Sequence, residues 1–112
     1  MATTSQDDPD RDLVEGFRRG DHQAFQKLVE RHEPFLQKLV FRYTKNLEEA
    51  KDVSQLSFLR AFEHRSSFRA ESSFRTWLYR IAVNLALNHV RRGPKDISIE
   101  LDDVVAFSSG LE

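Results

Sequence analysis

The chain has no cysteine, a single methionine and a single tryptophan among its 112 residues. The absence of cysteine excludes disulfide bonds, thiolate metal sites and a cysteine nucleophile. No apolar run approaches the ~20 residues that a membrane helix needs, and the first ten residues are polar and acidic, unlike a signal peptide. We therefore expect a soluble protein of the cytoplasm.

Residue types that bind metals or perform acid/base catalysis are present, but their spacing suits neither task. The four histidines lack close metal-ligand spacing: His22, His32, His64 and His89. Glu48 and Glu49 are adjacent, and this pair favours the start of a helix over an acid/base dyad. We expect no enzymatic activity, no metal site and no cofactor.

Charge is unevenly distributed, although the formal net charge is only -1. Residues 60–95 carry eight basic side chains and two acidic ones, whereas residues 96–112 carry five acidic side chains and no basic one. The cationic third of the chain predicts a polyanionic partner such as a nucleic acid. The acidic stretch is typical of a linker, although Ile97, Ile99 and Leu101 alternate with polar residues within it.

Apolar residues recur at three-and-four spacing in four segments, which predicts an all-α fold, a compact bundle of about four helices. The predicted helices cover residues 12–19, 21–43, 47–63 and about 73–92. Pro34 lacks an amide hydrogen and crowds the preceding turn, so we expect a kink or a break near residues 31–33. The helical domain then spans residues 12–92, between a mobile N-terminus over residues 1–11 and a disordered or extended acidic tail over residues 93–112.

Capping residues mark the predicted helix ends. Asp21 precedes the second helix, and Asn46 with Glu49 resembles a capping box at the start of the third. Ser72 or Ser73 is placed to cap the fourth helix. Glycine is a common helix terminator, and Gly20 and the Gly93-Pro94 pair follow the first and fourth helices.

The third predicted helix has one apolar face and one mixed face. Its apolar residues fall within one half-cylinder and are expected in the core: Leu47, Ala50, Val53, Phe58, Ala61 and Phe62. The opposite face carries acidic, amide and leucine side chains: Asp52, Gln55, Leu56, Leu59 and Glu63. Two leucines on an exposed face indicate a docking surface for another protein. Exposed leucines are also common on ordinary protein surfaces, and both interpretations stay open.

The fourth predicted helix divides into an apolar and a polar side. The apolar side is expected in the core: Phe74, Leu78, Ile81, Ala82, Leu85, Ala86 and Val90. The other side carries side chains able to contact bases and phosphates: Thr76, Trp77, Arg80, Asn84, Leu87, Asn88 and Arg91. A solvated polar face with a partly buried tryptophan would have the same composition. The basic segment of residues 65–75, which includes the aromatic Phe68, favours binding of nucleic acid with an unstacked base.

Three segments carry a family resemblance. They are residues 68–88, FRAESSFRTWLYRIAVNLALN, residues 52–62, DVSQLSFLRAF, and residues 20–25, GDHQAF. In this order and spacing they resemble region 2 of the extracytoplasmic-function sigma factors, group IV of the sigma-70 family of RNA polymerase sigma factors. The resemblance extends over about residues 12–92. It implies a bacterial promoter-recognition domain that binds core RNA polymerase and melts the minus-ten promoter element for transcription initiation, without covalent chemistry.

The resemblance also implies site residues. The clamp helices of the largest polymerase subunit would contact residues of the third helix: Asp52, Gln55, Leu56 and Leu59. A pocket for a flipped base of the non-template strand would be formed by His64, Asn84 and the loop residues Ser66, Ser67, Phe68, Arg69, Ser72 and Ser73. Thr76, Trp77, Arg80 and Asn88 would lie along the opened DNA, with Arg91 and Arg92 near its backbone.

Two departures from the family pattern keep a second interpretation open. Leu56 follows Gln55 where the family usually has an acidic residue, and the family's C-terminal helix-turn-helix domain is absent from these 112 residues. We expect an N-terminal domain followed by part of its linker. The alternative is a sigma-like decoy that binds an anti-sigma factor or polymerase without opening DNA.

Overall fold

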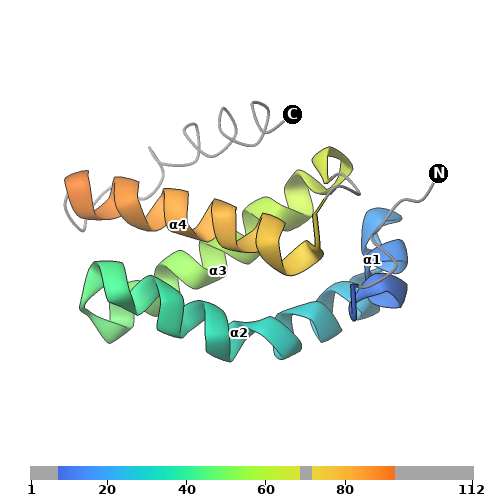
Figure 1. Cartoon of the computed structure of the whole chain (residues 1–112), viewed down its shortest axis with the longest axis horizontal. Coiled ribbons are helices and arrows are strands. Elements are labelled where there is room, and N and C mark those ends of the chain that lie inside the picture. Colours follow the sequence, from blue (N-terminus) through green and yellow to red (C-terminus); the bar gives the residue numbers. More distant parts are fainter. Residues whose placement is uncertain (1–7, 69–71, 93–112) are drawn as a thin grey trace.

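Four α-helices form the protein in the computed structural model, which describes residues 8–68 and 72–92. They are α1 (Arg11–Arg18), α2 (His22–Thr44), α3 (Leu47–Glu63) and α4 (Phe74–Arg92), with a short 3-10 helix η1 (Arg65–Ser67) after α3. Helices α2, α3 and α4 pack against one another, and α1 lies across the N-terminal end of α2 (Figure 1). The described residues contain no strand, so the predicted all-α class is confirmed. None of the helices described here is long and apolar enough to span a membrane.

Local hydrogen bonds fix the helix ends. The Asp21 carboxylate accepts from the backbone N–H groups of Gln23 and Ala24, and the Asn46 side chain accepts from that of Glu49. These two caps confirm the sequence predictions. The capping box is only half formed, because the Glu49 carboxylate contacts His89 at 3.1 Å. The role of Gly20 after α1 is likewise confirmed, since its φ of +87° lies in the left-handed region that favours glycine.

Pro34 lies inside α2, which continues through it without a break. The predicted break is therefore wrong. On either side of Pro34, α2 buries a stripe of residues four apart: Leu28, His32, Leu36 and Val40. Burial of this stripe on both sides of the proline offsets the lost backbone hydrogen bond, which costs about 3 kcal/mol.

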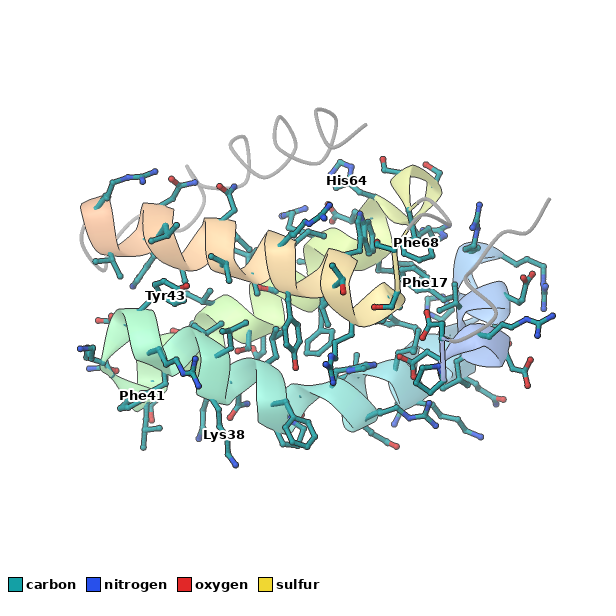
Figure 2. The ribbon with its side chains drawn as sticks, viewed as in Figure 1. Phe17, Lys38, Phe41, Tyr43, His64 and Phe68 are labelled. Atoms are coloured by element: carbon teal, nitrogen blue, oxygen red, sulfur yellow. The ribbon has the colours of Figure 1, made fainter. Side chains whose placement is uncertain are left out.

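The core is centred on aromatic rings near the start of α4. Phe74 lies 5.2 Å from Phe17 and 6.3 Å from Phe68, centroid to centroid, and Trp77 lies 5.2 Å from Phe68. Figure 2 shows Phe17 and Phe68 close to the first turn of α4. These rings join α1 and the segment after η1 to the three-helix bundle.

Most of the predicted core residues of α3 and α4 are buried or partly buried, but two are not. Leu47 is 68% exposed and Val90 is 49% exposed, so their assignment to the core was wrong. Leu47 is the first residue of α3, and Val90 lies in the last turn of α4. Helical periodicity assigns a residue to a face of its helix, whereas burial also requires that a neighbouring element extends that far.

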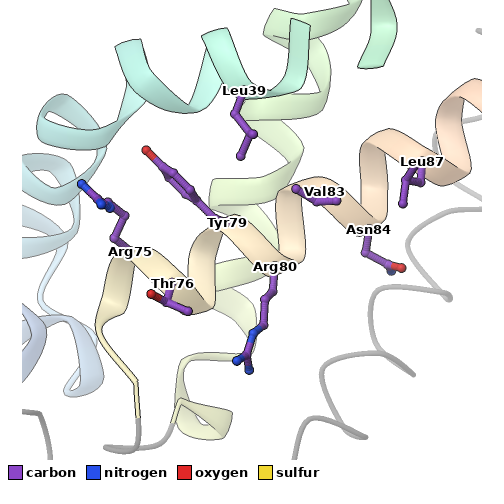
Figure 3. A pocket seen from close by; sticks show the side chains of 8 residues that line it. All are labelled: Leu39, Arg75, Thr76, Tyr79, Arg80, Val83, Asn84 and Leu87. Atoms are coloured by element: carbon purple, nitrogen blue, oxygen red, sulfur yellow. The ribbon is translucent and has the colours of Figure 1, made fainter. Parts of the chain in front are cut away.

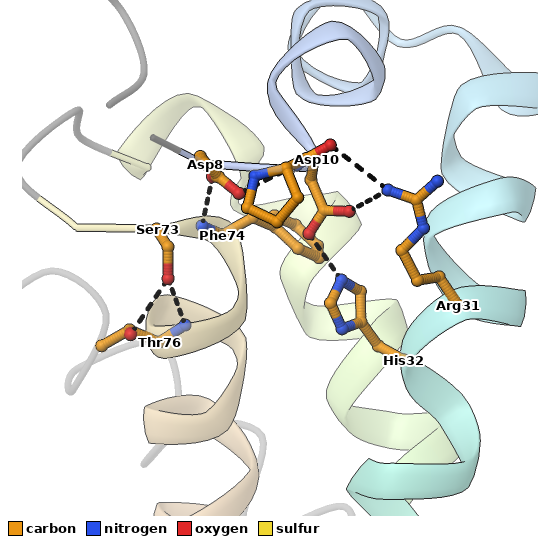
Figure 4. A network of polar contacts seen from close by, with 8 residues as sticks. Asp8, Asp10, Arg31, His32, Ser73, Phe74 and Thr76 are labelled. Atoms are coloured by element: carbon orange, nitrogen blue, oxygen red, sulfur yellow. Dashed lines mark hydrogen bonds and ion pairs between the residues drawn. The ribbon is translucent and has the colours of Figure 1, made fainter. Parts of the chain in front are cut away.

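The N-terminal residues 8–10 have a fixed place, in contrast to the mobile N-terminus expected from their polarity. The Asp8 carboxylate accepts from the backbone N–H of Phe74 at 2.9 Å and from that of Asp10 at 3.0 Å. The Asp10 carboxylate contacts Arg31 at 2.6 Å and His32 at 2.7 Å (Figure 4). Both aspartates are buried, and they connect the N-terminal segment to α2 and to the start of α4. Residues 1–7 of that predicted segment and the predicted tail, residues 93–112, lie outside the described ranges.

Candidate nucleic-acid interface

An open groove of about 540 Å³ runs along α4 where it faces α2. Two rows of α4 residues line it, each with a spacing of four residues, together with one leucine of α2. The lining residues are Arg75, Tyr79, Val83 and Leu87 in one row, Thr76, Arg80 and Asn84 in the other, and Leu39. Figure 3 shows Leu39 facing the row of Tyr79 and Val83, while Arg80 and Asn84 extend from the other edge of α4.

The groove combines an apolar floor with cationic side chains. Arg75 and Arg80 are exposed, and neither forms an ion pair with a carboxylate among the described residues. The Arg75 guanidinium lies 5.8 Å from the centre of the Tyr79 ring. Burial raises the pKa of the Tyr79 phenol, and the charge of Arg75 opposes this shift. The phenol therefore remains protonated near neutral pH and can donate a hydrogen bond to a ligand.

Three predicted DNA-binding residues line this groove together: Thr76, Arg80 and Asn84. A fourth, Arg91, is exposed on α4, one residue before the helix ends at Arg92. Ser73 acts locally, because its hydroxyl accepts from the backbone N–H of Thr76 at 3.1 Å and so caps α4. The predicted cap is confirmed, with Ser73 rather than Ser72 in that place. Ser72 is half-buried and its hydroxyl donates to the Ser73 carbonyl.

Three other predicted DNA-binding residues are buried: Phe68, Trp77 and Asn88. The assignment of Trp77 and Asn88 to the exposed side of α4 was wrong. Trp77 lies at the border of the apolar side, where Phe17 and Phe68 cover it, and Asn88 accepts a hydrogen bond from Arg91. In this conformation none of the three side chains faces solvent, so their contact with DNA stays a prediction.

The predicted base pocket is only partly within the described residues. His64 ends α3 and is half-buried, Ser66 is exposed and Ser67 is half-buried. His64 does not line the groove to which Asn84 contributes, so a base pocket shared by these two side chains stays a prediction. Arg69 and the side chain of Arg92 lie outside the described part of the chain.

The predicted polymerase-binding face of α3 is exposed except at Leu56. Asp52 and Gln55 are exposed, and Leu59 is 49% exposed. Leu56 is partly buried and packs against the core, which corrects its assignment to the exposed face. The free apolar surface of this face is therefore carried by Leu59.

Four groove residues are absent both from the predicted polar side of the fourth helix and from the predicted site residues. They are Leu39 and the three α4 residues Arg75, Tyr79 and Val83, of which only Arg75 falls within the basic segment of residues 65–75. The sequence did carry a signal for the last three, because they lie four residues apart and so form one row on α4. The position of Leu39 opposite this row depends on the packing of α2, which no local pattern specifies.

Arg60 is a buried cation that belongs to none of the predicted sites. Its guanidinium forms an ion pair with Glu63, and burial lowers its pKa. No group of three or more histidine, aspartate or glutamate side chains within residues 8–68 and 72–92 could hold a metal ion.

Comparison with known proteins places this arrangement in a family. The family model of sigma-70 region 2 matches residues 28–94. The RNA polymerase sigma-H factor of Pseudomonas aeruginosa is 42% identical over 101 residues, which cover 88% of this chain and 52% of that protein. The ECF RNA polymerase sigma-E factor of Escherichia coli K12 is 42% identical over 104 residues, which cover 90% and 54%. The chain spans about half the length of these curated relatives.

A solved structure shares the fold. It is the NMR structure of an engineered region 2 of sigmaE in complex with GTAAAA, with a TM-score of 0.69 and 39% sequence identity. The match covers 80% of this chain and 93% of that one. The family model, the sequence relatives and the shared fold agree, and the chain belongs to the sigma-70 region 2 family, with similarity to ECF sigma-E and sigma-H factors.

Proposed function

We propose that this domain is the minus-ten recognition part of an alternative sigma factor, acting in the bacterial cytoplasm. One observation carries the proposal: the exposed Thr76 and Arg80 and the half-buried Asn84 form a row along one edge of α4. The Arg75 guanidinium, which has no carboxylate partner among the described residues, lies beside this row. The neighbour with the same fold, at 39% identity, is in complex with GTAAAA.

The chemistry of the row suits single-stranded DNA. Guanidinium groups such as that of Arg80 pair with phosphates and stack on bases, while the Asn84 amide offers both a donor and an acceptor to a base edge. Binding the open strand better than the duplex shifts the equilibrium toward melted DNA. The domain thus needs differential affinity for the open strand and no covalent step.

Binding of the 112-residue chain to single-stranded GTAAAA tests the proposal, with fluorescence anisotropy measured at one stated salt concentration. We expect Asn84→Ala to reduce discrimination against a single-base variant of this sequence by about 1–3 kcal/mol, because one amide reads one base edge. The free energy of unfolding should change by less than about 0.5 kcal/mol, since Asn84 is only half-buried.

Arg91→Ala is the matched control on the same helix. Arg91 is exposed near the end of α4, and a phosphate contact there would weaken binding of all sequences alike and reduce the salt dependence. Equal discrimination by the Asn84→Ala variant and the natural chain would remove Asn84 from base recognition. Absence of any binding to GTAAAA would overturn the DNA-binding proposal.

The second partner that we propose is core RNA polymerase, bound through the exposed side of α3 that carries Asp52, Gln55 and Leu59. Leu59→Asp should weaken binding of core polymerase, or of its isolated clamp helices, by about tenfold or more, because it places a charge in the apolar centre of this face. Leu47→Asp is the control, since Leu47 is also an exposed leucine of α3 but lies at its start. Equal weakening by both variants would place the contact elsewhere.

Polymerase binding without affinity for DNA would identify the domain as a sigma-like decoy. The two experiments therefore distinguish promoter recognition from an interaction module that binds polymerase or an anti-sigma factor. Leu56 is a poor probe for this purpose, because its side chain packs on the core and a charge there would also change stability.

A further inference from the structure

The groove between α2 and α4 has an apolar surface and a cationic surface, which bind different ligand groups. Leu39, Val83 and Leu87 give it apolar surface, and Arg75 and Arg80 lie toward the start of α4. Within the described residues no carboxylate neutralises either guanidinium. A segment that combines alternating apolar side chains with acidic ones would satisfy both surfaces.

The chain itself contains such a segment immediately after the helix. The acidic tail, residues 96–112, has no basic residue and five acidic ones: Asp96, Glu100, Asp102, Asp103 and Glu112. Ile97, Ile99 and Leu101 alternate with polar residues at its start. In an extended chain alternate side chains point to opposite sides, so these three apolar residues share one side.

The length of the tail is sufficient to reach the groove. The groove residues of α4 lie between 5 and 17 positions before Arg92, which corresponds to about 8–26 Å along the helix axis. An extended chain advances about 3.3 Å per residue, so about 3–8 residues cover this distance after a reversal at Gly93-Pro94. Ile97 and Ile99 then fall near Leu87 and Val83, and the three acids at positions 100, 102 and 103 fall near Arg80 and Arg75.

We propose that the acidic tail folds back along α4 and docks in this groove, with its apolar residues on the groove floor and its carboxylates at Arg75 and Arg80. The groove shares Thr76, Arg80 and Asn84 with the row assigned to DNA, so a docked tail would compete with nucleic acid. The docking itself stands on the groove and the sequence of the tail, whereas the competition rests on the proposed function.

The docked tail would act as an internal polyanion. While docked, it lowers the affinity of the free domain for nucleic acid of any sequence, because the tail's charges neutralise the arginines that attract phosphates. Tighter ligands displace it, and salt weakens it, since the contact depends on exposed charges. The tail thereby makes DNA binding more selective.

Docking is measurable on the whole chain because no natural cysteine interferes. Ser98→Cys carries a nitroxide label between the two isoleucines, on the side of an extended tail opposite to theirs. We expect the label to broaden the NMR amide signals of Leu39, Tyr79 and Val83. The matched variant keeps the label and neutralises the tail through Glu100→Gln, Asp102→Asn and Asp103→Asn, and it should lose most of this broadening. Equal broadening in both labelled chains, or broadening confined to the last turn of α4, would overturn the proposal.

A DNA-binding measurement then tests the competition with the unlabelled chains. Neutralising the three tail acids should tighten binding of single-stranded GTAAAA by about three- to tenfold at about 0.1 M salt. The control neutralises three exposed acids elsewhere through Asp12→Asn, Glu30→Gln and Glu48→Gln, with the same change of net charge. Equal effects of the two triple variants would show a general charge effect and exclude competition in the groove.

The NMR and DNA-binding measurements distinguish a failure of tail docking from a failure of DNA binding. If the domain does not bind DNA, neither triple variant shows binding, but the label still reports the docked tail. If the tail does not dock, DNA binding persists while the groove amides are unaffected by the label.

Discussion

Replacing Phe74 with alanine should lower the free energy of unfolding by about 3–5 kcal/mol. The Phe74 side chain is fully buried at the centre of the aromatic cluster, where its ring lies 5.2 Å from that of Phe17, 6.1 Å from Trp77 and 5.6 Å from His32. Its truncation would leave a cavity lined by α1, α2 and α4 together. Urea denaturation followed by circular dichroism measures the loss.

Phe35→Ala is the control for this measurement. Phe35 lies on α2 and is 60% exposed, so its removal should change the free energy of unfolding by no more than about 0.5 kcal/mol. A Phe74→Ala variant as stable as the Phe35→Ala variant would contradict the central position of Phe74 in the core.

Trp77→Ala should also cost about 3–5 kcal/mol of stability, although the resemblance to sigma factors places this residue along the opened DNA. Trp77 is 3% exposed, and its ring lies 5.2 Å from that of Phe68 and 6.3 Å from that of Phe17. Trp77→Phe should lose less, because a phenyl ring retains part of the packing. If Trp77→Ala unfolded at the same urea concentration as the natural chain, the buried position would be wrong.

The fluorescence of Trp77 tests its position without a substitution, because it is the only tryptophan in the chain. A buried indole should show blue-shifted emission and weak quenching by iodide, and both should persist when GTAAAA is added. A red shift or strong quenching on addition of DNA would show that the ring leaves the core to contact the strand. The DNA-facing role predicted for Trp77 would then be correct for the bound state.

The predicted helix caps and the predicted helix terminator Gly20 rest on local chemistry, and the structure confirms them. Asp21, Asn46 and Ser73 cap their helices by hydrogen bonds to backbone groups within three residues, and Gly20 ends α1 through its own backbone freedom. Such interactions depend on the order of residues along the chain and little on distant neighbours. The all-α class follows in the same way from the spacing of apolar residues.

Errors in the fold occurred where distant contacts override a local rule. A kink or a break was expected before Pro34, and the break is wrong, because the buried stripe on both sides of the proline keeps the helix continuous. Asp8 and Asp10 were expected in a mobile terminus because they are charged, yet their partners, Phe74, His32 and Arg31, lie 21 to 66 positions away in the sequence. No pattern near residues 8–10 specifies those partners.

The predictions for the candidate interface show the same difference between local geometry and distant contacts. The four-residue spacing of Thr76, Arg80 and Asn84 by itself determined that these side chains share one edge of α4, because helical geometry fixes that relation. Only the tertiary structure decided that Trp77, near the border between the two sides of α4, is buried and that Leu39 completes a groove with α4. The physical reason is that the sequence sets the direction of a side chain around its own helix, whereas burial depends on which other elements pack against that side.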